Sequence, residues 1–239
     1  MRRDKNTEYD IADAAMERPY GFSVAGKSFF LYPLTLGKSF LLQRMLDCLE
    51  INQKNMQSDS VSEIFRLVKE QKEDCLSVIC CYTFNTPEEH FSVELADERR
   101  QLFVQLSDDE IATLMIVALG RDKTDEFVKY LGIDKEQDRI STVMRIKNRG
   151  SKNNMTFGGK SLFGTLLDAA CERYGWTKQY VVWGIDLVSL RLMLADKITS
   201  IYISDDERKS LPASVQNKDE EILKPTKENM QKILSMDWA

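Results

Sequence analysis

The chain has 239 residues, 43% of them hydrophobic, which is enough to fill the interior of one large domain or two small ones. It carries 33 Lys and Arg against 38 Asp and Glu, a formal net charge of -5, which disfavours general binding to nucleic acid or to an anionic membrane. The longest apolar run, Leu114 to Leu119, is far shorter than the ~20 residues that cross a bilayer. Residues 1–10 hold no signal-peptide core, so we expect a cytosolic protein.

The N-terminal part of the chain changes character at Pro19. Residues 1–19 are polar and predict a flexible arm. Residues 20–144 predict a β-hairpin followed by a helical domain. The hairpin is indicated by apolar residues on both sides of the turn sequence Ala25-Gly26-Lys27, with Pro33 after its second strand.

Capping signals place the helices of this domain. Thr35 is a predicted N-cap, and capping boxes occur at Ser60–Glu63 and Ser107–Glu110. Pro87 interrupts the helical pattern, and Gly132 predicts a helix end. The predicted helices cover 36–51, 60–81, 88–106, 111–119, a short segment before Gly132, and another from Asp134.

The C-terminal part opens with a change of charge. Residues 145–160 contain four cations within eight positions and no acid, which predicts a basic linker and is compatible with an anionic partner. Residues 161–204 predict a helical subdomain, and 205–239 a polar tail with one short helix at 227–236. The expected fold is therefore mostly α, a multi-helix, bundle-like body with a small N-terminal β-hairpin.

The cysteines and the single histidine limit the available chemistry. The cysteines are odd in number and form no Cys-x-x-Cys pair, which favours buried thiols over disulfides or zinc. They are Cys48, Cys75, Cys80, Cys81 and Cys171. His90, Glu94 and Glu98 follow at helical spacing, a pattern open to a metal site but more typical of a solvated face. We expect no enzymatic activity, no cofactor and no metal.

One stretch matches a phosphate-binding motif. Gly21 to Ser28 fits Gly-x4-Gly-Lys-Ser, in which a loop between a buried strand and a helix cradles phosphates. Here the following residues, Phe29 to Pro33, predict a strand instead of a helix. The sequence favours a hairpin turn, and nucleotide binding through Lys27 and Ser28 remains the alternative.

Aromatic residues are concentrated between Tyr174 and Trp183. On a helix beginning near Thr177, Tyr180 and Trp183 lie three positions apart, and Trp176 precedes the N-cap. Such a cluster forms either core or a protein-binding surface, where Trp and Tyr are enriched.

The segment Phe163 to Asp196, with Tyr-Gly-Trp-Thr and Tyr-Val-Val-Trp before an apolar helix, resembles the C-terminal signature of tail assembly chaperones of long-tailed bacteriophages. The N-terminal hairpin and the following residues 32–37, Tyr-Pro-Leu-Thr-Leu-Gly, are similar to how several members begin. The similar parts cover 20–50 and 160–200. After the second tryptophan the family pattern has an acidic residue, often followed by proline, whereas this chain has Gly184-Ile185-Asp186.

The resemblance implies a helical, non-enzymatic protein that binds the tape measure protein in the host cytoplasm and keeps it soluble. It also implies help in assembling tail-tube (major tail) protein and absence from the mature virion. Trp176, Tyr180 and Trp183 are then expected near the partner surface. The alternatives are a structural particle component, such as a connector or tail-completion protein, and a nucleotide-binding enzyme using Gly21 to Ser28.

Overall fold

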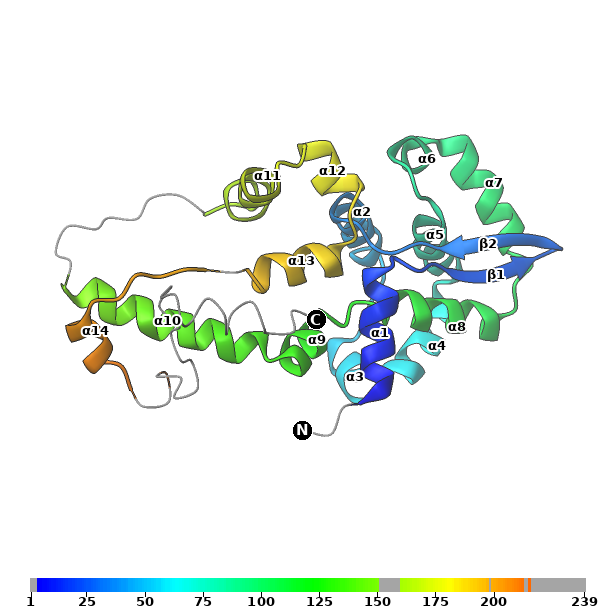
Figure 1. Ribbon diagram of the computed structural model, residues 1–239. Helices are drawn as coiled ribbons and strands as arrows, with labels where there is room; N and C mark the ends of the chain where they lie inside the picture. The colour runs from blue at the N-terminus through cyan, green and yellow to red at the C-terminus, as the bar shows by residue number, and fades with distance from the viewer. Residues whose placement is uncertain (1–3, 151–159, 198, 213–214, 216–239) are drawn as a thin grey trace. The chain divides into compact units, whose positions relative to one another are not determined.

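The computed structural model describes residues 4–150, 160–197, 199–212 and 215. The described chain is mostly α-helical with one antiparallel β-hairpin, as predicted (Figure 1). Its elements are α1 (Lys5–Ala15), β1 (Tyr20–Val24), β2 (Lys27–Leu31), α2 (Leu36–Leu46), α3 (Gln53–Ser58), α4 (Ser60–Glu70), α5 (Lys72–Thr83), α6 (Pro87–Phe91), α7 (Val93–Phe103), α8 (Asp108–Leu119), α9 (Thr124–Leu131), α10 (Ile133–Gly150), the π-helix η1 (Phe163–Asp168), α11 (Ala169–Tyr174), α12 (Lys178–Trp183), α13 (Leu187–Ala195) and α14 (Asp205–Lys209).

The chain divides into two compact units. Unit 1 comprises Met1–Ile133 and Phe157–Lys197, and unit 2 comprises Asp134–Thr156 and Ile198–Ala239. The predicted division at 145–160 is therefore displaced, and residues 161–197 belong with the N-terminal helices. The reason is that these residues pack against the start of α2, far away in the sequence, and the sequence pattern does not predict such long-range contacts.

The β-hairpin forms where the turn residues predict it. β1 pairs with β2 from Tyr20 opposite Leu31 to Val24 opposite Lys27. Ala25 and Gly26 connect the strands with φ of 49° and 76°, both in the left-handed region that a tight hairpin turn requires. Glycine adopts this conformation without steric cost, whereas at Ala25 it carries strain.

The larger hydrophobic core of unit 1 is built around α5. Residues Cys75 to Thr83 of that helix are buried, apart from half-buried Ser77, because α2, α4, α7, α8 and β2 all pack against it. The hairpin closes one side of this core through Phe22 and Phe29, whose rings lie 5.6 and 5.0 Å from the ring of Phe103. A helix surrounded in this way shows no clear polar face, in keeping with its nearly continuous apolar sequence.

A second apolar cluster joins the C-terminal helices of unit 1 to the start of α2. Its buried members are Leu36, Leu167, Ala170, Val181, Ile185, Leu187 and Leu190. The backbone adds two ties: an isolated bridge between Thr35 and Asp186, and a 2.7 Å hydrogen bond from Leu187 N–H to the Leu34 carbonyl. Residues 161–204 therefore do not form the separate subdomain that was predicted.

The predicted flexible arm is wrong for residues 5–15, which form α1. Asp4 caps the helix, accepting a hydrogen bond from the Asn6 N–H. Asp10 forms an ion pair with Lys123 at 2.6 Å, and Glu8 accepts a hydrogen bond from the Tyr130 hydroxyl at 3.2 Å. These polar contacts with residues far away in the sequence hold α1 in place. Its own sequence is too polar to show a stripe of apolar residues facing the core.

The predicted helix at 60–81 is two helices, α4 and α5, separated at Gln71. Gln71 leaves helical geometry, with φ of -136°, and its side-chain oxygen accepts the Glu50 N–H at 3.0 Å. The capping box predicted at Ser60 is also wrong, because Asp59 caps α4 and Glu63 turns inward. The box predicted at Ser107 is confirmed, with both of its hydrogen bonds present.

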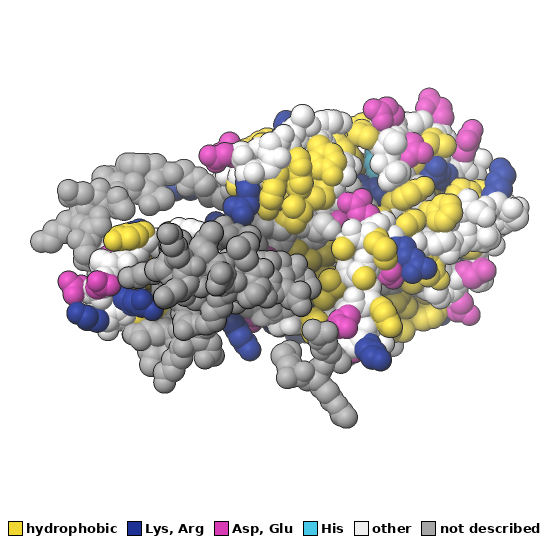
Figure 2. Space-filling view, viewed as in Figure 1, with side chains coloured by type: hydrophobic (Ala, Val, Ile, Leu, Met, Phe, Trp, Pro, Cys, Tyr) yellow, Lys and Arg dark blue, Asp and Glu magenta, His cyan; other side chains and the backbone are white. Residues whose placement is uncertain are grey.

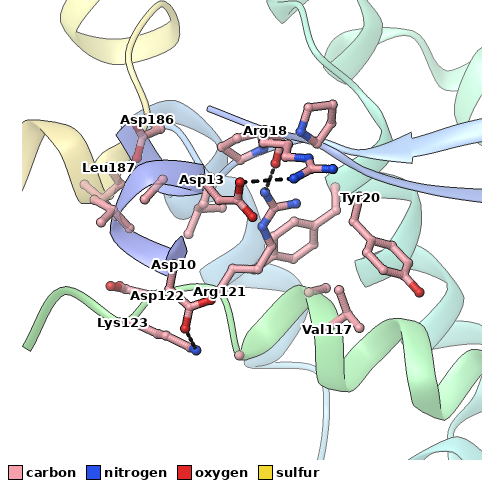
Figure 3. A pocket seen from close by; sticks show the side chains of 18 of the residues that line it. Asp10, Asp13, Arg18, Tyr20, Val117, Arg121, Asp122, Lys123, Asp186 and Leu187 are labelled. Carbon is pink, nitrogen blue, oxygen red and sulfur yellow. Dashed lines mark hydrogen bonds and ion pairs between the residues drawn. The ribbon is translucent and has the colours of Figure 1, made fainter. Parts of the chain in front are cut away.

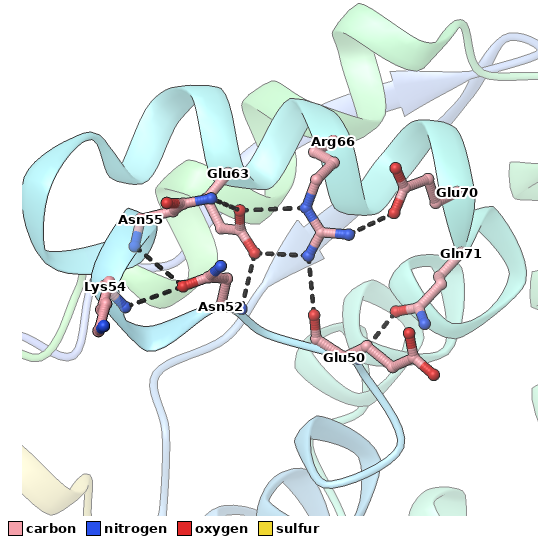
Figure 4. A network of polar contacts seen from close by, with 8 residues as sticks. All are labelled: Glu50, Asn52, Lys54, Asn55, Glu63, Arg66, Glu70 and Gln71. Atoms are coloured by element: carbon pink, nitrogen blue, oxygen red, sulfur yellow. Dashed lines mark hydrogen bonds and ion pairs between the residues drawn. The ribbon is translucent and has the colours of Figure 1, made fainter.

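Glu63 anchors a polar network at the start of α4 (Figure 4). Its carboxylate accepts the Asn52 N–H at 2.8 Å and the Asn55 side-chain amide at 3.2 Å. Arg66 donates to both oxygens of Glu63, at 2.6 and 3.1 Å, and also bonds the Glu50 carbonyl and Glu70. The Arg66 hydrogen bonds, followed by that from Asn52, lower the pKa of Glu63 to about 2.

Three further boundaries differ from prediction. The helix expected at 88–106 is broken at Ser92, which ends α6 and caps α7. The basic linker is wrong for residues 145–150, which continue α10. α14 occupies 205–209 within the predicted tail, while the closing helix predicted at 227–236 lies outside the described residues.

Candidate functional site

The residues of the phosphate-loop motif lie along the hairpin. Gly21 is in β1, Gly26 is in the turn, and Lys27 and Ser28 begin β2. No helix starts directly after Ser28, because β2 continues to Leu31, so no helix N-terminus lies where the motif needs a phosphate to sit. The geometry of a nucleotide-binding loop is absent from this segment.

The thiols of α5 are poorly suited to nucleophilic chemistry. Burial raises the pKa of Cys75 to about 11, of Cys80 to about 12 and of Cys81 to about 11, which keeps them protonated at neutral pH. Within the described residues, no group of three or more His, Cys, Asp or Glu side chains is placed to hold a metal ion. His90 lies on α6 and Glu94 and Glu98 on α7, so the break at Ser92 separates His90 from the two glutamates.

α12 carries two of the three residues expected at a partner surface. Thr177 caps the helix, as predicted, accepting the Tyr180 N–H at 3.2 Å. Val181 points into the second apolar cluster and is fully buried. With that side chain fixed inside, Tyr180 remains 43% exposed and Trp183 half-buried.

Trp176 and Tyr180 come together in an aromatic group that also includes Tyr174. The Trp176 ring stacks on Tyr174 at 4.6 Å and meets Tyr180 edge-on at 5.2 Å. The Tyr174 hydroxyl donates to the Met193 carbonyl at 2.9 Å, which ties the group to α13. Figure 2 shows a hydrophobic area over α11 and α12. We call Tyr174, Trp176 and Tyr180 the α11–α12 aromatic group.

Trp183 belongs to a different group of contacts. Its ring lies 5.6 Å from His90 and 6.0 Å from Phe91, both on α6. It also covers Gly37 of α2 so closely that a Cβ there would come within 2.7 Å of the indole. The structure therefore brings Trp176 and Tyr180 together, while Trp183 bridges α12, α2 and α6.

Next to Gly37 on α2 is a buried lysine, Lys38, that sequence reasoning missed, and its charge acts on the half-buried His90. Lys38 is 1% exposed and donates to the Pro33 carbonyl at 3.2 Å, and burial lowers its pKa to about 8. Burial and then the charge of Lys38 lower the pKa of His90 to about 4, so the imidazole is neutral at pH 7. Its Nε2 atom is buried without a hydrogen-bond partner. No local sequence signal indicates the burial of Lys38, since Gly37 and Trp183 meet only in the tertiary structure.

A cavity of about 520 Å³ lies under α1 and beside the hairpin (Figure 3). Its charged side chains are mostly paired: Asp10 with Lys123, Asp13 with Arg18 at 3.2 Å, and Asp122 with Arg191 at 2.8 Å. The paired lining leaves little net charge to select a charged ligand.

Arg121 and Asp186 complete the polar wall of this cavity. Arg121 donates to the Leu31 carbonyl at 2.7 Å and to the Arg18 carbonyl. Asp186 is 3% exposed and accepts the Ser189 N–H at 2.9 Å, while its second oxygen is buried without a partner. Glu17 accepts the Asp186 N–H at 3.3 Å, and burial together with the Asp186 carboxylate raises the pKa of Glu17. This wall fastens α1 and the hairpin to α13, a structural role.

No protein-family model, curated protein or solved structure matches the chain. Among the described helices, none combines the length and the apolar character needed to cross a membrane.

Proposed function

We propose that the chain is a non-enzymatic tail assembly chaperone of a long-tailed bacteriophage or prophage. In this role it binds the tape measure protein in the host cytoplasm, keeps it soluble while tail-tube protein assembles, and leaves before the virion is complete. Two features support the proposal: the sequence resemblance, and a mostly helical fold with an N-terminal hairpin of the kind that the resemblance implies. The first site to test is the α11–α12 aromatic group.

The observation that carries the proposal is aromatic surface on α12. Tyr180 is 43% exposed although it follows a capped, well-packed helix start, and its ring rests on Trp176. Rigid aromatic side chains gain contact area at low entropic cost, which makes them frequent anchors of protein interfaces. A long helical partner would present apolar residues every three to four positions to such a surface.

The test is co-expression with the products of neighbouring genes, above all any long protein with a helical sequence pattern encoded nearby. We expect the long protein to become soluble and to co-purify with this chain. Tyr180→Ala should weaken association about tenfold or more, as for a central aromatic anchor, with little change in thermal stability. Tyr9→Ala, on α1 and 68% exposed, is the matched control and should bind normally.

The location of the protein in particle preparations separates the proposal from its alternative. A chaperone is lost from purified particles, whereas a connector or tail-completion protein is retained in fixed stoichiometry. Retention, or failure of every neighbouring product to bind, would contradict the chaperone role.

A further inference from the structure

The junction between α6 and α7 exposes two large apolar side chains. Phe91 is 66% exposed and Val93 69% exposed, on either side of the break at Ser92. The break is a defined structure, because the Ser92 side chain caps α7 by accepting the Leu95 N–H at 3.2 Å. Exposed apolar side chains on an ordered backbone mark a partner surface where they join a wider apolar patch.

These side chains continue onto neighbouring elements of unit 1. The Phe91 ring meets Trp183 edge-on at 6.0 Å, and Trp183 lies against Gly37. Phe40, three residues further along α2 and on the same side of that helix, is 48% exposed. We call Phe40, Phe91, Val93 and Trp183 the α6–α7 apolar face; it draws side chains from α2, α6, α7 and α12.

The rim of this face is acidic. Glu88, Glu94 and Glu98 are exposed, and none of them has an ion pair among the described residues. Acidic side chains gather over α6 and α7 at the upper right of Figure 2.

The cations of α7 do not neutralise this rim. Arg99 turns inward, donating to the Thr83 carbonyl at 2.5 Å, and lies 3.6 Å from Glu89. Arg100 is paired with Asp97 at 2.5 Å. The rim therefore keeps an uncompensated negative charge beside an exposed apolar surface.

We propose that the α6–α7 apolar face docks an amphipathic helix of a partner protein, with Lys or Arg residues flanking its apolar stripe. The inference rests on the proposed function, since it names the chemistry of the segment that such a partner would present. An apolar stripe would cover Phe91 and Val93, and flanking cations would pair with Glu94 and Glu98. The acidic rim adds attraction at long range, so association should weaken as salt rises.

A synthetic probe tests this docking without knowledge of the partner. The probe is a labelled amphipathic helical peptide of leucine and lysine, about four turns long, with a leucine–glutamate peptide of the same pattern for comparison. Fluorescence anisotropy with the full chain should detect binding of the lysine peptide at low salt, weakening about tenfold near 0.5 M salt. The glutamate peptide should not bind.

Variants of the face decide where the peptide binds. Phe91→Ser should weaken the lysine peptide about tenfold, and Glu94→Gln with Glu98→Gln about fivefold with a flatter salt dependence. The control is Glu73→Gln with Asp74→Asn, which removes two exposed acids from the first turn of α5 and should bind as the parent does. Circular dichroism and melting temperature check that each variant is folded.

The outcomes separate this inference from the proposed function. No binding of the lysine peptide, or equal binding by parent and face variants, overturns the docking site. If neighbouring gene products still co-purify with the Phe91→Ser chain, the chaperone role stands and its contact lies elsewhere. If the peptide results hold but no neighbouring product binds, the docking face stands and the chaperone role fails.

Discussion

Two carboxylates of unit 1 are almost equally buried but differently surrounded. Glu63 is 2% exposed and Asp186 3% exposed. Glu63 has a cation, a backbone N–H and a side-chain amide on its two oxygens. Asp186 has the N–H of Ser189 on one oxygen and no partner on the other, with Glu17 as its neighbour.

The difference teaches how a buried acid is tolerated. Around Glu63, hydrogen bonds and the Arg66 charge favour the ionised form and lower the pKa, so ionisation supports folding. Around Asp186 no cation bonds the carboxylate, although the charge of Arg121 acts on it without an ion pair. A second acid, Glu17, lies beside it, and the pKa of Glu17 rises, so ionisation of Glu17 opposes folding. The Glu63 region therefore stabilises the fold. The Asp186 region connects α1 to α13 but includes an unfavourable electrostatic interaction.

The largest effect is expected from Arg66→Leu, which breaks the anchor. Glu63 would keep its bonds to Asn52 and Asn55 but would lose its cation, and a carboxylate so little exposed is costly without one. Thermal unfolding at pH 7 should show a fall of several degrees. Glu70→Gln removes only the exposed partner of Arg66 and should cost about 0.5 kcal/mol or less. Equal effects of the two changes would show that Glu63 does not depend on its cation.

Acid titration tests the anchor by a second route. Because the pKa of Glu63 is lowered to about 2 from an ordinary 4.5, its contribution is complete above about pH 4.5 and is lost as the pH falls towards 2. Stability of the parent should therefore fall more steeply over this range than that of Glu63→Gln. Parallel curves from urea unfolding at several pH values would contradict the assignment.

Replacements of Asp186 separate its cap from its unpaired oxygen. Asp186→Ala removes the N-cap of α13 and should cost about 1 kcal/mol. Asp186→Asn keeps an oxygen for the Ser189 N–H and removes the charge beside Glu17, so its stability should stay close to that of the parent. A large loss in the Asn variant would show that the carboxylate itself stabilises the join.

The smallest effect is expected from Glu17→Gln. Since the folded-state pKa of Glu17 is raised, its penalty is fully present above that pKa and disappears as the pH falls below the unfolded value. The variant should melt slightly higher than the parent at pH 8 and at the same temperature near pH 4. Glu172→Gln, exposed on α11, is the control and should shift neither value. A gain that persists at acid pH would have another cause.

Local signals in the sequence determined the class of fold and many helix starts. The turn at Ala25-Gly26 gave the hairpin, and Thr35, Ser107 and Thr177 all cap the helices that they were expected to cap. Such features depend on residues within one turn of each other, and so they can be predicted directly from the sequence. Local spacing placed Tyr180 and Trp183 on one side of the helix, and the resemblance added Trp176. The structure joins Tyr180 to Trp176 and places Trp183 against His90 instead.

Only the tertiary structure decided where these elements meet. Glu63 left its predicted capping box because Arg66 and Asn52 offered stronger partners, and the polar sequence of α1 became a helix held by Lys123 and Tyr130. Trp183 packs against Gly37 and not against Tyr180, because the absence of a side chain at Gly37 leaves room for the indole. In such cases the free energy of contacts between residues far apart in the chain outweighs local conformational preference. These contacts decide which polar groups have hydrogen-bond partners and which apolar surfaces are covered.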